Sequence, residues 1–203
     1  MEDETQLVES MKKGDRDAFD RIYERYSNQI LRMAYLIVGN RADSEDIMQE
    51  TFIKCYLHCK ELKKNAGFRS WLYQILTRTA WNYGKKGSKE FPDEEIERTA
   101  ERTDGTSALD VIIHKEQAQE ICDAIRKLDI KYRTIVVYYY YNQMSTKEIA
   151  TACNCLEGTV KSRLFTARGQ LKKYLQNAEK EVNRDEVSGR LGYTNQAGVA
   201  NGR

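Results

Sequence analysis

The chain has 203 residues, of which 32% are charged and 40% are hydrophobic, and it contains one proline. This length and composition suit one or two small helical domains. No apolar run approaches the roughly eighteen residues that a membrane span needs, and no signal peptide precedes the first charged helix, so we expect a cytoplasmic protein without membrane insertion. The formal net charge of +2 does not by itself indicate a nucleic-acid ligand, because an acidic segment offsets basic helices in the total.

The first 43 residues predict two helices and a turn. A short apolar helix ends at Gly14, and Asp15 is placed to cap a second, amphipathic helix. Its pattern continues to Gly39, where we expect the helix to stop. Residues 40–43 are expected to form a polar turn.

Residues 44–59 predict a helix with two distinct faces. The expected packed face consists of Ile47, Met48, Phe52, Ile53, Tyr56 and Leu57. On one flank Asp46, Gln49 and Glu50 cluster at i, i+3 and i+4, a pattern that suits either a docking surface for a basic partner or a solvated face. A catalytic carboxylate pair is not favoured, because an exposed helix face lacks the enclosing pocket that would shift a pKa.

The five cysteines are odd in number and irregularly spaced, which makes a disulfide framework improbable and agrees with a reducing compartment. Cys55, His58 and Cys59 could share a metal on one helix, but zinc needs a further ligand and no nearby residue is an obvious candidate. We therefore expect no metal and no cofactor. A redox or zinc sensor built on these three residues is kept as an alternative.

A polar loop at 61–67 precedes a helix over 68–86 that is rich in aromatic and basic residues. Tryptophans in helices are usually core residues, and that reading applies to both Trp71 and Trp81. An aromatic, basic helix beside a loop is also what capture of unpaired bases requires, since an extruded base must stack or form hydrogen bonds.

Periodicity disappears after this helix. The segment 87–107 is predominantly acidic and is interrupted by Pro92 and Gly105, which predicts a flexible linker. Its charge is compatible with a merely solubilising tether. A second helical region begins near Ala108, where Asp129 is placed to cap a helix and the tyrosine run 138–141 is expected to be helical rather than a strand.

Residues 145–175 predict a helix-turn-helix. Ser145 and Glu148 have the spacing of a capping box, and Asn154 falls in the turn, where it tolerates positive φ. The buried stripe of the second helix is expected to be Val160, Leu164, Ala167, Leu171 and Leu175. The residues left pointing outward are Lys161, Ser162, Arg163, Phe165, Thr166 and Arg168, a set with the chemistry for base edges and phosphates. An ordinary helical hairpin with a basic face is the alternative.

Two motifs carry a resemblance to a known family. E-G-T-V-K-S-R-L-F-T-A-R resembles the minus-thirty-five reading helix of the extracytoplasmic-function (ECF) sigma factors, although Thr166 stands where that family often has Arg and Leu156 where it often has Pro or Ser. D-S-E-D-I-M-Q-E-T-F-I-K resembles the sigma-two signature. The resemblance implies that this second helix docks on the clamp-helix coiled coil of the RNA polymerase β′ subunit through Asp46, Gln49 and Glu50.

A third stretch, F-R-S-W-L-Y-Q-I, is similar to the sigma region that reads and melts the minus-ten element. The resemblance implies minus-ten roles, base capture or phosphate contact, for Asn65, Phe68, Arg69, Trp71, Arg78, Asn82, Lys85 and Lys86. It likewise implies minus-thirty-five contacts for Thr159, Lys161, Ser162, Arg163, Phe165, Thr166 and Arg168.

These observations predict an all-α protein with two small helical domains joined by a flexible acidic linker. The expected divisions are a sigma-two-like domain at 1–86, a linker at 87–107, a sigma-four-like domain at 108–176 and a disordered tail at 177–203. The resemblance implies a non-enzymatic sigma factor that binds core RNA polymerase at the β′ clamp helices and β flap, together with promoter DNA and an anti-sigma factor. The rival hypothesis is a stand-alone helix-turn-helix regulator, which would need a sensor domain built on strands.

Overall fold

The computed structural model describes residues 3–86 and 120–192, with side chains for 3–84 and 120–177. Within these ranges the regular structure is entirely helical, as the sequence predicts. The front unit contains α1 (Glu4–Lys12), α2 (Arg16–Val38), α3 (Arg41–His58), the short turns η1 (Cys59–Glu61) and η2 (Asn65–Gly67), and α4 (Phe68–Lys86). The predicted linker at 87–107 lies outside the described residues.

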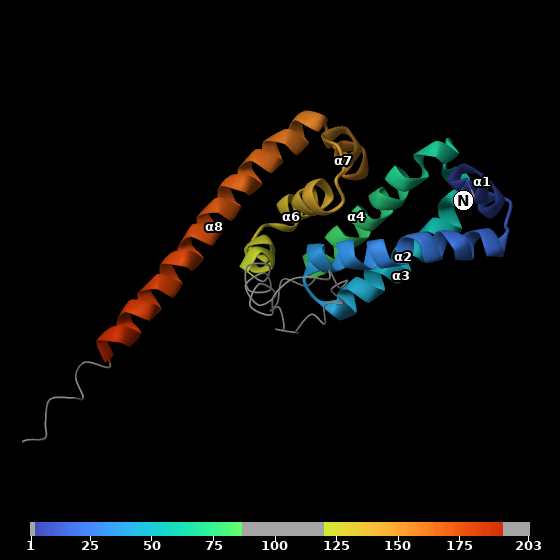
Figure 1. Cartoon of the computed structure of the whole chain (residues 1–203). Coiled ribbons are helices and arrows are strands. Elements are labelled where there is room, and N and C mark those ends of the chain that lie inside the picture. The colour runs from blue at the N-terminus through green and yellow to red at the C-terminus, as the bar shows by residue number, and fades with distance from the viewer. Residues whose placement is uncertain (1–2, 87–119, 193–203) are drawn as a thin grey trace, which may run out of the picture.

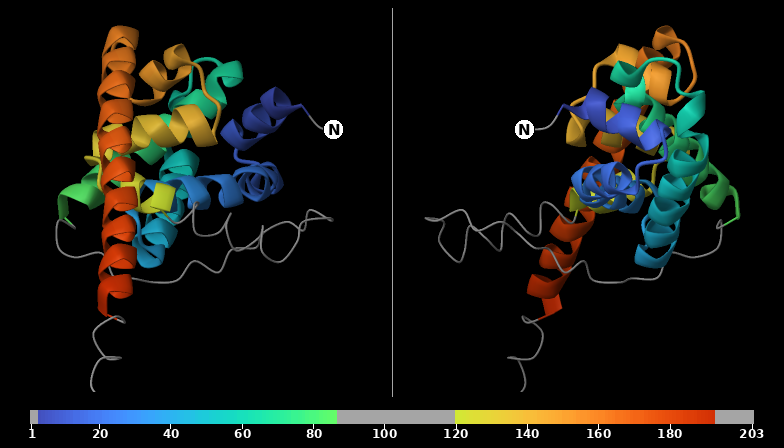
Figure 2. Two further views of the ribbon diagram at one scale, coloured as in Figure 1. Left: turned by 60° about the vertical axis from the view of Figure 1, so that its left-hand side comes forward. Right: turned by 90° about the vertical axis from the view of Figure 1, so that its right-hand side faces the viewer.

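The second unit starts with a helical stretch that ends at residue 126. It continues with α6 (Ile130–Val136), η3 (Val137–Tyr141), α7 (Thr146–Ala152) and α8 (Glu157–Gly192). Figure 1 shows α8 as the longest element, which leaves the body of the molecule at its C-terminal end. Figure 2 shows from two further sides that α8 extends beyond the other helices.

Helix boundaries follow the capping residues that the sequence predicts. The Asp15 carboxylate accepts hydrogen bonds from the amides of Asp17 and Ala18 at 3.0 and 3.3 Å and starts α2, which ends at Gly39 with a left-handed φ of 91°. The expected polar turn at 40–43 is instead the first turn of α3. The Asn40 side chain accepts from the amide of Asp43 at 2.8 Å, so this helix begins at Arg41.

The tyrosine run is helical, as expected, but it is wound as a π-helix over Val137–Tyr141. The amide of Asn142 donates to the carbonyl of Val137 at 3.1 Å, which is the wider spacing of that helix type. Within this run Tyr138 is fully buried, whereas Tyr140 is 54% exposed.

The expected loss of order at residue 177 is wrong for most of the tail, because α8 continues to Gly192. The loss of the apolar stripe after Leu175 predicts that the helix ends there. The early residues of the tail, among them Ala178, Glu179, Lys180 and Glu181, are nevertheless strong helix formers, so local propensity favours continuation of the helix. Residues 193–203 lie outside the described part of the chain.

The two units share one hydrophobic core. In the front unit α2 packs against α1 and α3, and α4 packs against α3. The other side of α4 contacts α6 and α7, so the principal core cluster runs without interruption from Leu7 in α1 to Leu164 in α8. Both views in Figure 2 show the second unit against the front unit rather than apart from it.

Candidate nucleic-acid interface and docking face

The helix-turn-helix forms as predicted. Ser145 and Glu148 make the reciprocal capping box: the Ser145 Oγ accepts from the Glu148 amide at 3.2 Å, and the Glu148 carboxylate accepts from the Ser145 amide at 2.8 Å. These bonds from Ser145 lower the pKa of Glu148, and Arg69 of α4 adds a smaller effect in the same direction. Asn154 takes the turn with a φ of 49°.

Helix α8 has one buried side and one open side. Val160, Leu164 and Ala167 are buried, as predicted, and Leu171 and Leu175 further along are half-buried. The predicted contact residues occupy the remaining surface: Lys161, Ser162, Phe165 and Arg168 are exposed, and Thr159, Arg163 and Thr166 are half-buried. Phe165 is 80% exposed, which is unusual for a large apolar side chain in a folded protein.

Several of these outward residues already have partners within the chain. The Lys161 ammonium lies 2.8 Å from the Glu157 carboxylate, and the Thr166 hydroxyl donates to the backbone carbonyl of Ser162 at 3.1 Å. Both interactions are at the surface, so they cost little to exchange for contacts with DNA. The cations, hydroxyls and single exposed ring on this helix face complement the groups that the major groove of DNA presents, namely base-edge acceptors and donors and the thymine methyl.

Arg168 is held by two tyrosines of η3. Its Nε donates to the Tyr140 hydroxyl at 2.7 Å, and its guanidinium carbon lies 5.5 and 5.7 Å from the ring centres of Tyr139 and Tyr140. The hydrogen bond from Arg168 to Tyr140 raises the pKa of the arginine above its ordinary value. The sequence reading missed the role of Tyr140, because the two residues are 28 positions apart.

Helix α4 is buried on more than one side, and one predicted site residue belongs to its core. Phe68 has no exposed surface and packs with its ring centre 5.8 Å from Tyr26 and 6.1 Å from Trp71. Phe68 therefore offers no exposed ring in this structure, and its predicted base contact stays a prediction. Trp71 is half-buried against the same core.

The other predicted minus-ten residues lie nearer the surface. Arg69, Arg78 and Asn82 are exposed, and the Asn65 side chain accepts from the Lys12 ammonium at 3.0 Å. The Arg69 Nε donates to the Tyr73 hydroxyl at 3.2 Å, which fixes the guanidinium along the start of α4. Lys85 and Lys86 lie in α4, but their side chains are outside the described residues.

The predicted acidic patch forms on α3. Asp46 and Gln49 are exposed, and Glu50 is partly exposed and lies 2.6 Å from the Lys54 ammonium. Next to them, burial and then the Glu50 and Asp46 carboxylates raise the pKa of the Tyr83 phenol in α4. The patch therefore borders the C-terminal part of α4.

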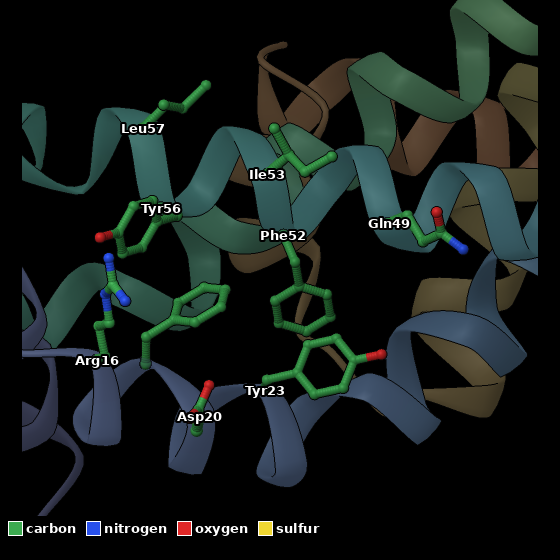
Figure 3. Close-up of a pocket in the computed structure, with 9 residues that line it drawn as sticks. Arg16, Asp20, Tyr23, Gln49, Phe52, Ile53, Tyr56 and Leu57 are labelled. Carbon is green, nitrogen blue, oxygen red and sulfur yellow. The ribbon is translucent and has the colours of Figure 1, made fainter.

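A groove continues the acidic patch along α3. It has a volume of about 620 Å³ and lies between α2 and α3. Figure 3 shows Phe52 of α3 meeting Tyr23 of α2 across it, and Tyr56 of α3 near Arg16 of α2 at one end. The sequence reading assigned Ile53 and Leu57 to the packed face, which is wrong, since they are 58% and 67% exposed. The exposed face of α3 is thus polar at its start and apolar toward its end.

The cysteine and histidine cluster has no metal-site geometry. Cys55 and Cys59 are buried free thiols, whereas the exposed His58 ring lies 2.7 Å from the Glu61 carboxylate. In the described residues no three potential ligands gather around one point. Among the helices of 3–86 and 120–192, none has the length and apolar character to cross a bilayer.

Two family models match the chain, one for each unit. The model for sigma-70 region 2 matches residues 22–90, and the model for sigma-70, region 4 matches residues 118–171. The open helix-turn-helix lies in the second match, and the acidic patch and α4 lie in the first. The two matches together identify the chain as a sigma factor of the sigma-70 class.

Individual relatives narrow the class. The chain is 35% identical over 178 residues to the ECF RNA polymerase sigma factor SigW of Bacillus subtilis, covering 84% of this chain and 95% of that protein. Among solved structures it resembles CnrH in complex with the cytosolic domain of CnrY, with a TM-score of 0.65 and 19% identity over 86% of this chain and 97% of that one. It also resembles the sigma factor RpoE in complex with the anti-sigma factor NepR from Bartonella quintana, with a TM-score of 0.60 and 20% identity over 78% and 96%.

The chain belongs to the ECF sigma factors of RNA polymerase. It is therefore an alternative sigma factor, a protein that directs promoter-specific transcription.

Proposed function

We propose that this sigma factor docks on the β′ clamp helices of core RNA polymerase through the exposed face of α3. Asp46, Gln49 and Glu50 supply the polar half of this face, and they suit a partner helix that carries basic residues. Lys54 pairs with Glu50 at the surface, and such an exposed pair is readily exchanged for a partner's cation.

The groove between α2 and α3 supplies the apolar half of the docking face. Ile53 and Leu57 project from α3 beside the aromatic floor, so a partner helix with apolar residues four positions apart would cover them. Removing this apolar surface from water favours binding, while the acidic end sets the direction of the partner.

DNA recognition is divided between the units. In this proposal α8 enters the major groove of the minus-thirty-five element, with Lys161, Arg163 and Arg168 meeting phosphates or guanine edges and Phe165 contacting a thymine methyl. Asn65, Arg69, Trp71, Arg78, Asn82, Lys85 and Lys86 bind the minus-ten segment. Because α4 binds the unpaired form, it shifts the equilibrium between duplex and melted DNA toward the melted state, and no covalent reaction is needed.

The exposed reading face of α8 is the observation that carries the proposal, because it leaves a basic, aromatic surface on a helix whose opposite side is buried at Val160, Leu164 and Ala167. The protein in this account catalyses no covalent reaction, acts in the cytoplasm, contacts the polymerase β flap with its second unit and is regulated by an anti-sigma factor. A stand-alone helix-turn-helix regulator would bind DNA in the absence of polymerase and would have no use for the α3 face.

Co-elution with purified core polymerase tests the docking face. Reversing charge with Asp46→Lys and Glu50→Lys should abolish co-elution while helical content stays unchanged. Glu9→Lys and Glu24→Lys make the same change of charge on exposed positions of α1 and α2, and this control should still bind. If the α3 variant co-elutes as well as the control, α3 is only a solvated face.

A further inference from the structure

Helix α1 precedes both family-model matches, the first of which starts at residue 22, yet it belongs to the core. Leu7, Val8 and Met11 are buried, and the Tyr26 hydroxyl of α2 donates to the Glu4 carboxylate at the start of the helix. Helix α1 also contacts η1 and η2, the two short turns between α3 and α4. An element outside the matched residues therefore supports the loop that leads into α4.

Lys12, in the last turn of α1, makes the polar part of this contact. Its ammonium donates to the backbone carbonyl of Leu62 at 2.6 Å and to the Asn65 Oδ1 at 3.0 Å. Lys12 is half-buried and follows Met11, which is 1% exposed, so packing fixes the point from which the side chain reaches the loop. The lysine thus holds both the backbone of the loop and the side chain of Asn65.

This contact fixes the polarity of the Asn65 side chain. An ammonium group has donors and no acceptor, so the amide atom that faces Lys12 must be the oxygen. The amide nitrogen makes no hydrogen bond within the described part of the chain, and both of its N–H donors are unused. Asn65 keeps part of its surface in solvent. It therefore meets a ligand as a donor.

Donor polarity matters for the selection of a base. An extruded base is read by hydrogen bonds to its Watson–Crick edge. A group that offers donors alone matches an edge that presents acceptors. Guanine fits worst, because two of the three polar groups on its Watson–Crick edge are donors. An asparagine amide turned the other way would offer its oxygen and would favour guanine instead.

We propose that Lys12 is a positioning residue for minus-ten recognition, because it holds the Asn65 oxygen and so makes Asn65 a hydrogen-bond donor toward the captured base. The inference rests on the proposed function, since it concerns the same loop. Helix α1 contributes to base selection in this way without touching DNA itself. Part of the specificity is then set by a residue outside the region 2 match.

Selection from a randomised template tests the inference. Holoenzyme assembled from the full-length protein and core polymerase would bind fork-junction DNA whose unpaired minus-ten segment is random, and the bound strands would be sequenced. Wild-type protein should deplete guanine at one position, and Asn65→Ala should abolish that depletion. A wild-type holoenzyme that selects no base anywhere in the segment would reject the proposed function. Base selection that Asn65→Ala leaves unchanged would overturn the inference alone.

Lys12→Met removes the ammonium and keeps the length of the side chain. It should reduce the discrimination against guanine about fivefold, the factor that one hydrogen bond contributes, and should leave the other positions unchanged. Lys12→Arg keeps a donor at this place and should retain the preference. The matched control is Lys13→Met, because Lys13 is exposed and pairs with Glu9 of its own helix at 2.8 Å. Binding that weakens equally for all four bases in Lys12→Met would show that Lys12 only holds the loop, and would overturn the inference.

Asn65→Asp reverses the polarity and keeps the contact with Lys12. Both carboxylate oxygens accept, so one can keep the lysine while the other is offered to the base. The preference at this position should change toward guanine. The added charge lowers affinity for every base alike, so the preference and not total binding is the readout.

This variant also serves if Lys12→Met folds poorly, because the ammonium stays in place, and circular dichroism checks the helical content of each protein. Depletion of guanine that survives in Asn65→Asp would overturn the inference.

Discussion

Helices α4 and α8 are assigned to two elements of one promoter, yet the fold treats them in opposite ways. Helix α8 is packed along one side and leaves Phe165 and Arg168 in solvent. Helix α4 is packed on its own bundle through Phe68 and on the second unit through Trp81. The face of α8 that is assigned to DNA is exposed, whereas much of α4 is covered by neighbouring helices.

The difference arises from how apolar residues are spread around each helix. The buried positions of α8 form a single narrow stripe, Val160, Leu164 and Ala167, and one packed face satisfies them. In α4 the buried positions follow one another, as in Leu72 and Tyr73, so no single partner can cover them all. A helix of that kind serves as the joint between two units and cannot also be fully open to a ligand.

The largest predicted effect separates two phenylalanines at predicted DNA positions. Phe68→Ala should lower the free energy of unfolding by about 3–5 kcal/mol, because it empties a fully packed site. Phe165→Ala should change it by no more than about 0.5 kcal/mol, because that ring is already in water. Urea unfolding followed by circular dichroism measures both values. Equal losses would mean that Phe165 is also a core residue.

The next effect concerns the open helix. Arg163→Ala should weaken binding of the holoenzyme to a minus-thirty-five duplex by about 1–3 kcal/mol if the side chain reads a base, or should reduce the salt slope by about one if it contacts phosphate. Lys173→Ala, further along α8 and outside the reading set, is the control. No change in either quantity would remove Arg163 from the DNA-binding surface.

A smaller effect is expected at the start of α7. Ser145→Ala should cost about 1 kcal/mol of stability, because it removes one half of the capping box. The pKa of Glu148 is lowered in the folded protein, so its contribution is present above the ordinary value of 4.5 and is lost as the pH falls through the lowered pKa. Unfolding measured from pH 6 downward should show this loss in the wild type and not in Glu148→Gln. Identical pH curves for the two proteins would contradict the assignment.

The smallest effect tests whether Tyr140 positions Arg168. Tyr140→Phe keeps the ring beneath the guanidinium but removes the hydroxyl that accepts from its Nε, so affinity for the duplex should fall by about 0.5–1 kcal/mol. In an Arg168→Ala background the same change should have no effect, because the group it orients is gone. Additive losses in the double variant would show that Tyr140 acts independently of Arg168.

Features set by near neighbours in the chain were predictable. The caps at Asp15, Ser145 and Asp129 and the left-handed turn at Asn154 each depend on residues a few positions away, and all four are present. The helix-turn-helix, with its buried stripe, follows from the same local rules.

Features set by distant packing were not predictable. The helical period places Ile53 on the apolar face of its helix, but it does not indicate whether another helix covers that position. None of the described elements buries Ile53. The resemblance implies a base contact for Phe68, yet Tyr26 of α2 packs against its ring. The joint at Trp81 and Tyr138 pairs side chains that have no regular sequence relation, so only the folded chain shows which face of α4 remains open.

Run-off transcription on three templates tests the central claim most directly, namely that α4 and α8 act together on one promoter. Purified core polymerase would be given templates with both elements, with the minus-ten element alone or with the minus-thirty-five element alone, each in the presence and absence of this protein. The account predicts a defined transcript that needs the protein and both elements. An initiation pattern that does not change when the protein is added would contradict it.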